Sequence, residues 1–244
     1  MGVGEETKAD GRFPKRTPLD LEATVREYSL ERVSRHKRDS YAGVRLAKLP
    51  EDLRVYEHLI WASKPNTGIE IGTLCGGSAL WFRDRLRTLA GYVEIGRPLV
   101  ISIDLDTGQA CEDLVAVDPA YEETISLVEA DVTDPDLPGV VEALLPEGAR
   151  CLVVEDSEHV FDTTMAALVG FARFVPEQGY FVVEDGSVDY EEMRPRTDWP
   201  RGGVLPGVRE WLGTAQGRKF RVRRDLEIYG ITSHPEGFLQ RIAP

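Results

Sequence analysis

Cysteine and long apolar runs are scarce in this sequence. Its three cysteines, Cys75, Cys111 and Cys151, share no short metal-ligand spacing, which favours free thiols over a disulfide framework or a zinc cluster. No stretch approaches the roughly 18 consecutive apolar residues that a membrane helix needs. Residues 1–16 also lack the apolar core of a signal peptide. We therefore expect a cytoplasmic protein without a membrane partner.

Positive charge is scarce as well. The chain has 29 Lys and Arg against 42 Asp and Glu, which gives a formal net charge of −13. Because binding a phosphate backbone needs a basic surface, this balance argues against a nucleic-acid partner. Two stretches, 32–38 and 218–224, are locally basic. The simplest interpretation of each is a solvated helix or strand face.

The 244 residues are enough for one large α/β domain with an N-terminal extension, or for two small domains. Residues 1–18 are charged and rich in Gly, Pro and Lys, which predicts a disordered arm. Residues 19–63 predict a helical extension, with helices over 19–38 and 50–63. Residues 64–244 then form the main domain.

Short apolar segments alternate with helical stretches from residue 64 onwards. The expected strands are residues 68–71, 99–103, 125–129, 151–154, 180–183, 220–222 and 239–242. The expected helices are residues 77–89, part of 112–123, 137–145, 163–174 and 205–215. This alternation predicts a doubly wound α/β fold with a mostly parallel, seven-stranded, Rossmann-like sheet.

The first expected strand leads straight into a glycine turn and then a helix. Gly72 would allow a tight turn beside a ligand, while Gly76 and Gly77 would allow a close backbone approach. The helix would then offer free N–H groups to an anionic ligand. Dinucleotide-binding dehydrogenases also have such a turn. Here Thr73 and Leu74 follow Gly72, which departs from G-x-G-x-x-G, and a purely structural turn remains an alternative.

Carboxylates follow the second and third expected strands. Asp104 and Asp106 come at the end of the second, where an acid commonly accepts hydrogen bonds from ribose hydroxyls. Asp131 follows the third and could accept a hydrogen bond from an adenine amino group. The alternative for Asp131 alone is a capping or turn aspartate. In an open α/β sheet the ligand binds at these carboxyl ends.

The fourth and fifth expected strands also end in acids. Asp156 follows the fourth, and Glu184 and Asp185 follow the fifth. Parallel strands end at the same sheet edge, so these carboxylates could converge on a hard divalent cation such as Mg²⁺. Without a cation the concentrated negative charge would repel itself. The alternative is that the acids cap the helices that follow.

His159 is the candidate general base. It lies three residues after Asp156, and its ordinary pKa suits proton transfer near neutral pH. A surface or core histidine is the alternative. The loop over residues 186–203, with Tyr190, Arg194 and Trp199, could close over an acceptor. A flexible insertion is the alternative there.

Five stretches of the chain together match a known family. They are residues 48–52, 70–81, 156–159, 182–185 and 230–239. With these residues the chain resembles the cephalosporin hydroxylase-like and rhamnosyl O-methyltransferase-like proteins. These are class I methyltransferases, dependent on S-adenosylmethionine, of antibiotic and glycolipid biosynthesis. More distantly the chain is similar to the metal-dependent macrolide sugar O-methyltransferases.

The resemblance implies roles for residues at the strand ends. The implied cofactor residues are Glu70, Gly72, Thr73, Gly76, Ser78, Asp104, Asp131 and Asp156. The implied metal ligands are Asp156, Glu184 and Asp185, with His159 as the base. Two positions depart from the family pattern: Glu158 stands where an Asp is frequent, and Gly186 stands where a Thr is frequent.

The function implied is Mg²⁺-dependent methyl transfer from S-adenosylmethionine to a hydroxyl of a sugar or polyol. The acceptor would be a secondary metabolite, such as a glycosylated natural product in antibiotic biosynthesis, and the enzyme a homo-oligomer. The alternatives are a catechol-type O-methyltransferase, an NAD-linked oxidoreductase, a metal-dependent hydrolase and a non-catalytic partner protein that binds S-adenosylmethionine.

Overall fold

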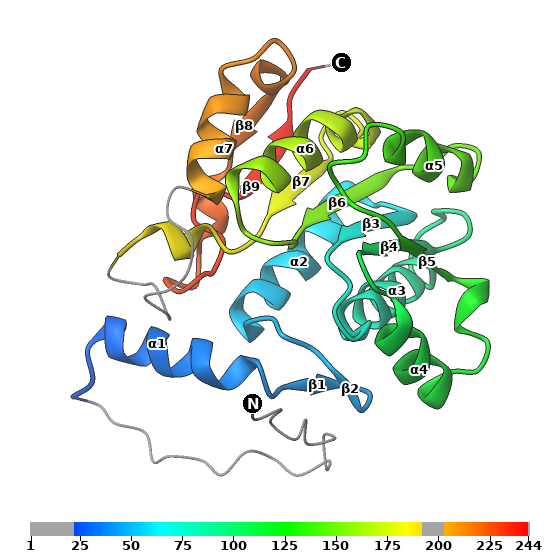
Figure 1. Ribbon diagram of the computed structural model, residues 1–244, viewed down its shortest axis with the longest axis horizontal. Coiled ribbons are helices and arrows are strands. Elements are labelled where there is room, and N and C mark those ends of the chain that lie inside the picture. The colour runs from blue at the N-terminus through cyan, green and yellow to red at the C-terminus, as the bar shows by residue number, and fades with distance from the viewer. Residues whose placement is uncertain (1–21, 192–202, 244) are drawn as a thin grey trace.

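A seven-stranded sheet runs through the part of the chain described by the computed structural model, residues 22–191 and 203–243 (Figure 1). Its strands are β3 (Thr67–Ile71), β4 (Leu99–Asp104), β5 (Ile125–Glu129), β6 (Cys151–Glu155), β7 (Tyr180–Val183), β8 (Phe220–Val222) and β9 (Phe238–Arg241). The strand order is β5-β4-β3-β6-β7-β9-β8. The five neighbouring strands β5, β4, β3, β6 and β7 are parallel, and β9 is antiparallel to both β7 and β8. This confirms the predicted doubly wound, mostly parallel sheet.

The central strands are apolar on both faces because helices cover both. In β6, Leu152 and Val154 pack into one core, while Val153 packs into the other. This alternation follows from the two-residue period of a strand. All five residues of β3 are buried as well. A strand buried on both faces reads as a continuous apolar run, and this made the strands predictable.

The described residues contain seven α-helices. They are α1 (Val25–His36), α2 (Pro50–Ser63), α3 (Gly77–Ala90), α4 (Gly108–Val117), α5 (Leu137–Leu144), α6 (Phe161–Phe171) and α7 (Val204–Leu212). Helices α2, α3 and α4 share one core with the sheet, and α5, α6 and α7 share the other, as the layers in Figure 1 show. None of the described helices is long and apolar enough to cross a membrane.

The N-terminal extension contains more than helices. Helix α1 begins at Val25 because Thr24 and Glu27 form a capping box, in which each side chain accepts a hydrogen bond from the other's backbone N–H. The predicted start at residue 19 and the predicted arm over 1–18 lie outside the described residues. A hairpin of β1 (Ser40–Tyr41) and β2 (Val44–Arg45) follows α1.

The hairpin and several short 3₁₀ helices were absent from the prediction. Ala42 and Gly43 both have positive φ, which is typical of a two-residue hairpin turn, but two-residue strands are too short to give a pattern. The 3₁₀ helices are η1 (Tyr121–Glu123), η2 (Ala172–Phe174), η3 (Gly186–Asp189), η4 (Gly217–Lys219) and η5 (Arg224–Leu226). The predicted helix within 112–123 is α4 followed by η1, because Pro119 restricts Asp118.

Candidate active site

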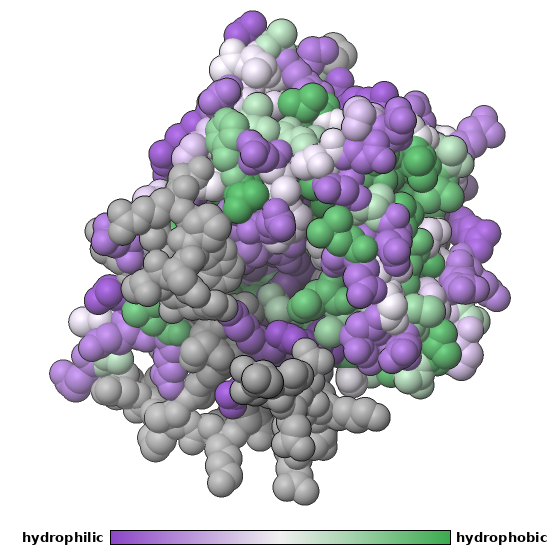
Figure 2. Space-filling view, in the orientation of Figure 1, coloured by the Kyte–Doolittle hydropathy of each residue, from purple (hydrophilic) through white to green (hydrophobic). Residues whose placement is uncertain are grey.

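The carboxyl ends of the parallel strands border a cavity of about 620 Å³. Residues that follow β3, β4, β5, β6 and β7 all contribute to its wall. In Figure 2 the hollow lies near the middle of the visible face, with hydrophilic side chains gathered around it. Ligands of open α/β sheets bind at this edge. The predicted site residues on the wall are Gly72, Thr73, Ser78, Asp104, Asp131, Asp156, His159 and Asp185.

The glycines after β3 are needed where the chain passes close to itself. Gly72 has φ +103°, and a Cβ there would lie 2.0 Å from the backbone oxygen of Asp156. A Cβ on Gly77 would lie 2.0 Å from the backbone oxygen of Arg45. Gly76, with φ +82°, is the N-cap of α3 and is not on the cavity wall. Close approach to a ligand was predicted for Gly76 and Gly77, whereas the close contacts observed are within the protein, of Gly72 with the Asp156 backbone and of Gly77 with the Arg45 backbone.

Asp104 holds the glycine turn in place. Its Oδ2 accepts hydrogen bonds from the backbone N–H groups of Thr73 (2.8 Å) and Leu74 (2.9 Å), and its Oδ1 accepts one from Leu105. An ionised carboxylate has about four lone-pair sites. Three backbone hydrogen bonds therefore leave Asp104 capacity for one ligand hydroxyl at the wall of the cavity.

Asp131 is a turn aspartate on the cavity wall. Its Oδ1 accepts hydrogen bonds from the backbone N–H of Thr133 (2.8 Å) and from the Thr133 hydroxyl (2.7 Å), and these bonds lower the pKa of Asp131. The turn alternative raised for this residue thus describes its geometry correctly. Its position on the wall also leaves the adenine contact open.

Glu70 lies in the interior on β3 and is not on the wall of the cavity. Its Oε2 accepts a hydrogen bond from the Ser102 hydroxyl (2.7 Å), which also lies 2.8 Å from the Thr73 hydroxyl. Burial raises the pKa of Glu70 to about 7. The sequence did not predict the role of Ser102, whose place within an apolar strand gave no signal.

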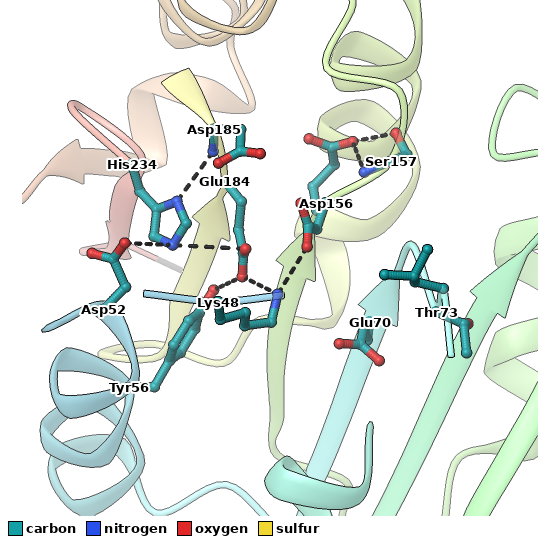
Figure 3. Close-up of polar contacts among 12 residues, drawn as sticks. Lys48, Asp52, Tyr56, Glu70, Thr73, Asp156, Ser157, Glu184, Asp185 and His234 are labelled. Atoms are coloured by element: carbon teal, nitrogen blue, oxygen red, sulfur yellow. Dashed lines mark hydrogen bonds and ion pairs between the residues drawn. The ribbon is translucent and has the colours of Figure 1, made fainter. Parts of the chain in front are cut away.

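The acids that end β6 and β7 meet on a lysine (Figure 3). The ammonium of Lys48 donates to Asp156 Oδ2 at 2.9 Å and to Glu184 Oε1 at 2.7 Å. The Lys48 side chain is only 2% exposed. Tyr56, on α2, donates its hydroxyl hydrogen to the same Glu184 oxygen. The predicted convergence of the two strand ends is therefore present, with an internal cation between two of the acids.

Asp156, His159 and Asp185 form a second group, on the cavity wall. His159 Nε2 lies 3.3 Å from Asp185 Oδ2, and His159 Nδ1 lies 4.0 Å from Asp156 Oδ1. One ligand atom from each residue lies within 4.8 Å of the others, so the group could hold a metal ion. Glu184, from the predicted metal set, is 2% exposed and lies behind this wall. The structure thus divides the predicted ligands between the cavity and the interior.

The acid centre consists of Lys48, Tyr56, Asp156 and Glu184. His234 connects the C-terminal loop to this centre. Its Nδ1 accepts a hydrogen bond from the backbone N–H of Asp185 at 3.1 Å, which leaves the ring proton on Nε2. That nitrogen lies 3.4 Å from Asp52 Oδ2 and 3.7 Å from Glu184 Oε2. Asp52 also accepts hydrogen bonds from the Thr232 hydroxyl and from the backbone of residue 233. The loop before β9 is therefore fixed to α2.

The sequence prediction assigned no role to these buried partners. Lys48, Asp52 and His234 lie within stretches that match the family, which was the available signal. Tyr56 lies in the predicted helix over residues 50–63, and its ring packs against Phe82. Its hydroxyl end has the polar role, which spacing does not reveal.

The ends of the predicted covering loop are held together at Asp189. Its carboxylate oxygens accept hydrogen bonds from the backbone N–H groups of Gly203 (2.9 Å) and Leu205 (2.7 Å). A Cβ on Gly203 would lie 2.2 Å from the backbone oxygen of His159, so the start of α7 packs against the histidine. Arg194 and Trp199 lie outside the described residues.

Curated relatives are about a quarter identical to this chain over the aligned residues. The rhamnosyl O-methyltransferase of Mycobacterium tuberculosis (strain ATCC 25618 / H37Rv) is 26% identical over 211 residues, which cover 83% of this chain and 78% of the relative. The rhamnosyl O-methyltransferase of Mycobacterium leprae (strain TN) is 26% identical over 206 residues, which cover 83% of this chain and 82% of the relative.

Solved structures with the same fold include CmcI with Mg and SAM, at a TM-score of 0.62 and 21% identity, covering 100% of this chain and 89% of that one. The TDP-rhamnose 3'-O-methyltransferase CalS11 matches at a TM-score of 0.53 and 19% identity, covering 78% of each chain. MycE with Mg, SAH and mycinamycin VI matches at 0.52 and 15% identity, covering 88% of this chain and 54% of that one. At these identities the likeness supports the fold.

The sequence match to a family model covers most of the chain. The model of the Rhamnosyl O-methyltransferase/CmcI family matches residues 34–242, from the end of α1 through β9. This range includes every wall residue of the cavity and the acid centre behind it. The chain therefore belongs to the Rhamnosyl O-methyltransferase/CmcI family and is an O-methyltransferase.

Proposed function

We propose that this enzyme transfers the methyl group of S-adenosylmethionine to a hydroxyl of a sugar or polyol, with a divalent cation such as Mg²⁺ at the cavity wall. The main support for this proposal is that a single cavity is lined both by the glycine turn after β3 and by the group of Asp156, His159 and Asp185. The names of the curated relatives favour a sugar acceptor.

The proposed cofactor site follows the strand ends in order. Gly72, Thr73 and Ser78 would receive the methionine end beside the N-terminus of α3, with Glu70 and Gly76 behind them. The remaining lone pair of Asp104 suits a ribose hydroxyl, and Asp131 suits the adenine amino group. Asp156 would lie near the sulfonium, whose positive charge its carboxylate favours.

The proposed metal residues are Asp156 and Asp185, with Glu184 behind them and His159 beside them. Carboxylate oxygens are the donors that Mg²⁺ prefers, so this donor set fits a hard divalent cation. Such a cation would lower the pKa of an acceptor hydroxyl and would hold two adjacent hydroxyls. The structures of CmcI and MycE with Mg support this part of the proposal.

His159 is the proposed proton acceptor. Its Nε2 faces Asp185, which stabilises a proton on that nitrogen and leaves Nδ1 to accept the proton of the acceptor hydroxyl. Burial alone would lower the pKa of His159, but the charges of Asp185 and Asp156 outweigh it and raise the pKa. In the transfer the carbon–sulfur bond breaks as the carbon–oxygen bond forms, and the products are S-adenosylhomocysteine and the methyl ether.

The acceptor that we propose is a glycosylated secondary metabolite of an antibiotic-type pathway. Vicinal hydroxyls on a sugar ring suit a cation site of this kind. A homo-oligomeric state and a cytoplasmic location are part of the same proposal and rest on the family resemblance and the sequence features described above.

The proposal is tested by ligand binding followed by an acceptor screen. Calorimetric titration should show binding of S-adenosylmethionine and no binding of NAD. Incubation with rhamnosides, other glycosides and a catechol should then yield a product heavier by one methyl group, detected by mass spectrometry, from a glycoside. Binding of NAD in place of S-adenosylmethionine would contradict the proposed reaction, and methylation of the catechol alone would contradict the acceptor class.

A further inference from the structure

The lysine inside the acid centre has an unusual environment for an ammonium group. Lys48 lies in the segment between β2 and α2, and its side chain is 2% exposed. It forms ion pairs with the acids that end two different strands, Asp156 at 2.9 Å and Glu184 at 2.7 Å. A fully buried lysine is rare unless it is paired.

The negative charge around Lys48 explains why the ammonium is buried. Glu184 is 2% exposed, and a charge at such depth destabilises the fold unless an opposite charge lies next to it. Two carboxylates within 3 Å favour the charged form of Lys48, so the side chain acts as a cation in this centre.

The two oxygens of Asp156 have different partners. Oδ2 accepts the hydrogen bond from Lys48 (Figure 3). Oδ1 lies 4.0 Å from Nδ1 of His159 on the cavity wall. A single carboxylate thus belongs both to the interior ion pair and to the group that could hold a metal ion. Any cation bound at the wall would share Asp156 with an ammonium group and would be repelled by it.

We propose that Lys48 is a built-in counter-cation of the acid centre, a positioning residue that competes with the divalent cation for Asp156 and thereby weakens metal binding. The inference rests on the metal site of the proposed function. In the metal-free protein Lys48 holds the two strand ends together. When a divalent cation binds, Lys48 limits its affinity and keeps the ion exchangeable.

The test measures metal affinity, with no methyl transfer involved. Mn²⁺ or Mg²⁺ is titrated by calorimetry into the metal-stripped full-length protein, comparing wild type with Lys48→Met, Lys48→Gln and Lys48→Arg. Both uncharged variants should bind the cation at least about tenfold more tightly, because a positive charge next to the site is removed. Lys48→Gln keeps a hydrogen-bond donor for the two carboxylates, so it provides an uncharged variant for the test even if Lys48→Met fails to fold. Lys48→Arg should restore wild-type affinity.

Lys64→Met is the matched control, because it removes the same charge at the far end of α2. Lys64 donates to the backbone oxygen of Trp61 and is separated from the centre by a 14-residue helix, about 20 Å long. Its affinity should equal that of wild type. A purely structural role for Lys48 would weaken binding or leave it unchanged, so the direction of the change separates the two roles.

Each outcome decides the inference. Tighter cation binding by Lys48→Met and Lys48→Gln than by wild type supports the inference. The same holds if both variants bind the cation measurably and wild type binds it too weakly to measure. Equal or weaker binding in both variants overturns the role of Lys48 and leaves the metal site intact. No binding in any of the proteins overturns the inference together with the metal part of the proposed function.

Discussion

At the scale of single residues, depth decides what each carboxyl group does. Glu70 and Glu155 are fully buried, and burial raises the pKa of each to about 7. Asp131 lies at the surface, and hydrogen bonds from Thr133 lower its pKa. All three side chains are carboxylic acids with similar ordinary pKa values, so the opposite shifts are a property of the fold.

The buried carboxyl group of Glu155 should make the free energy of unfolding depend on pH in a specific way. Its pKa is about 7 in the folded protein and near 4.5 when the chain unfolds, so the folded state binds the proton more tightly. The free energy of unfolding should therefore fall as pH rises from about 4.5 to 7, by up to about 3 kcal/mol. Glu155→Gln removes this group, and its urea-unfolding free energies at pH 5, 6, 7 and 8 should fall less than those of wild type. Parallel curves for the two proteins would show that burial of Glu155 has no such effect.

His159 should control the chemical step and not the binding of the cofactor. We expect His159→Ala to lower kcat by about 10²- to 10⁴-fold, the usual contribution of a general base, with an unchanged Kd for S-adenosylmethionine. The matched control is His58→Ala, because His58 is exposed on α2, where its Nε2 lies 3.2 Å from the Tyr229 hydroxyl. A His159→Ala enzyme with near wild-type kcat would remove the histidine from the mechanism.

At the scale of elements, patterns along the chain predicted the sheet but not the centre behind it. The five parallel strands were predictable because each one is a short, mostly apolar run that ends in, or is followed by, Gly, Asp or Glu. Four residues in and beside this centre come from distant parts of the chain. Lys48 lies between β2 and α2, Tyr56 lies on α2, Glu184 follows β7, and His234 lies in the loop before β9. No local spacing joins such distant residues, so only the folded arrangement reveals the network.

The turn after β3 should tolerate no side chain at Gly72. Gly72→Ala combines φ +103° with a contact of 2.0 Å to the Asp156 backbone, so we expect a loss of about 3 kcal/mol or more in the free energy of unfolding. Gly139→Ala is the control, because its Cβ would meet nothing within 4 Å and it lies inside α5. That variant should be neutral or slightly more stable. Urea unfolding of the two variants checks the difference, and equal stability would contradict the described packing of β3 against β6.

At the scale of the whole molecule, the two ends of the chain close the site together. The N-terminal extension contributes Lys48, Asp52 and Tyr56, and the loop before β9 contributes His234. These residues meet at the end of β7, which lies between β6 and β9 in the sheet. The acid centre therefore depends on the extension as well as on the Rossmann-like sheet, which argues that both form one functional unit.

Cofactor binding should stabilise the entire molecule. S-Adenosylhomocysteine at about 100 times its Kd adds about 2.7 kcal/mol to the free energy of unfolding. For a chain of this size that corresponds to a rise in Tm of roughly 5–10 °C. Differential scanning calorimetry with and without the ligand checks this, with NAD as the control ligand. An unchanged Tm with S-adenosylhomocysteine and a raised Tm with NAD would contradict the assigned cofactor.

The central claim is that carboxylates from two strand ends hold a divalent cation beside the methyl donor. Its most direct test is the rate of methyl transfer to a rhamnosylated acceptor by chelator-treated enzyme, as free Mg²⁺ is restored stepwise. We predict that activity is lost with the chelator, returns in a saturable manner with Mg²⁺ and stays absent in Asp156→Ala. A full rate in excess chelator would contradict the account.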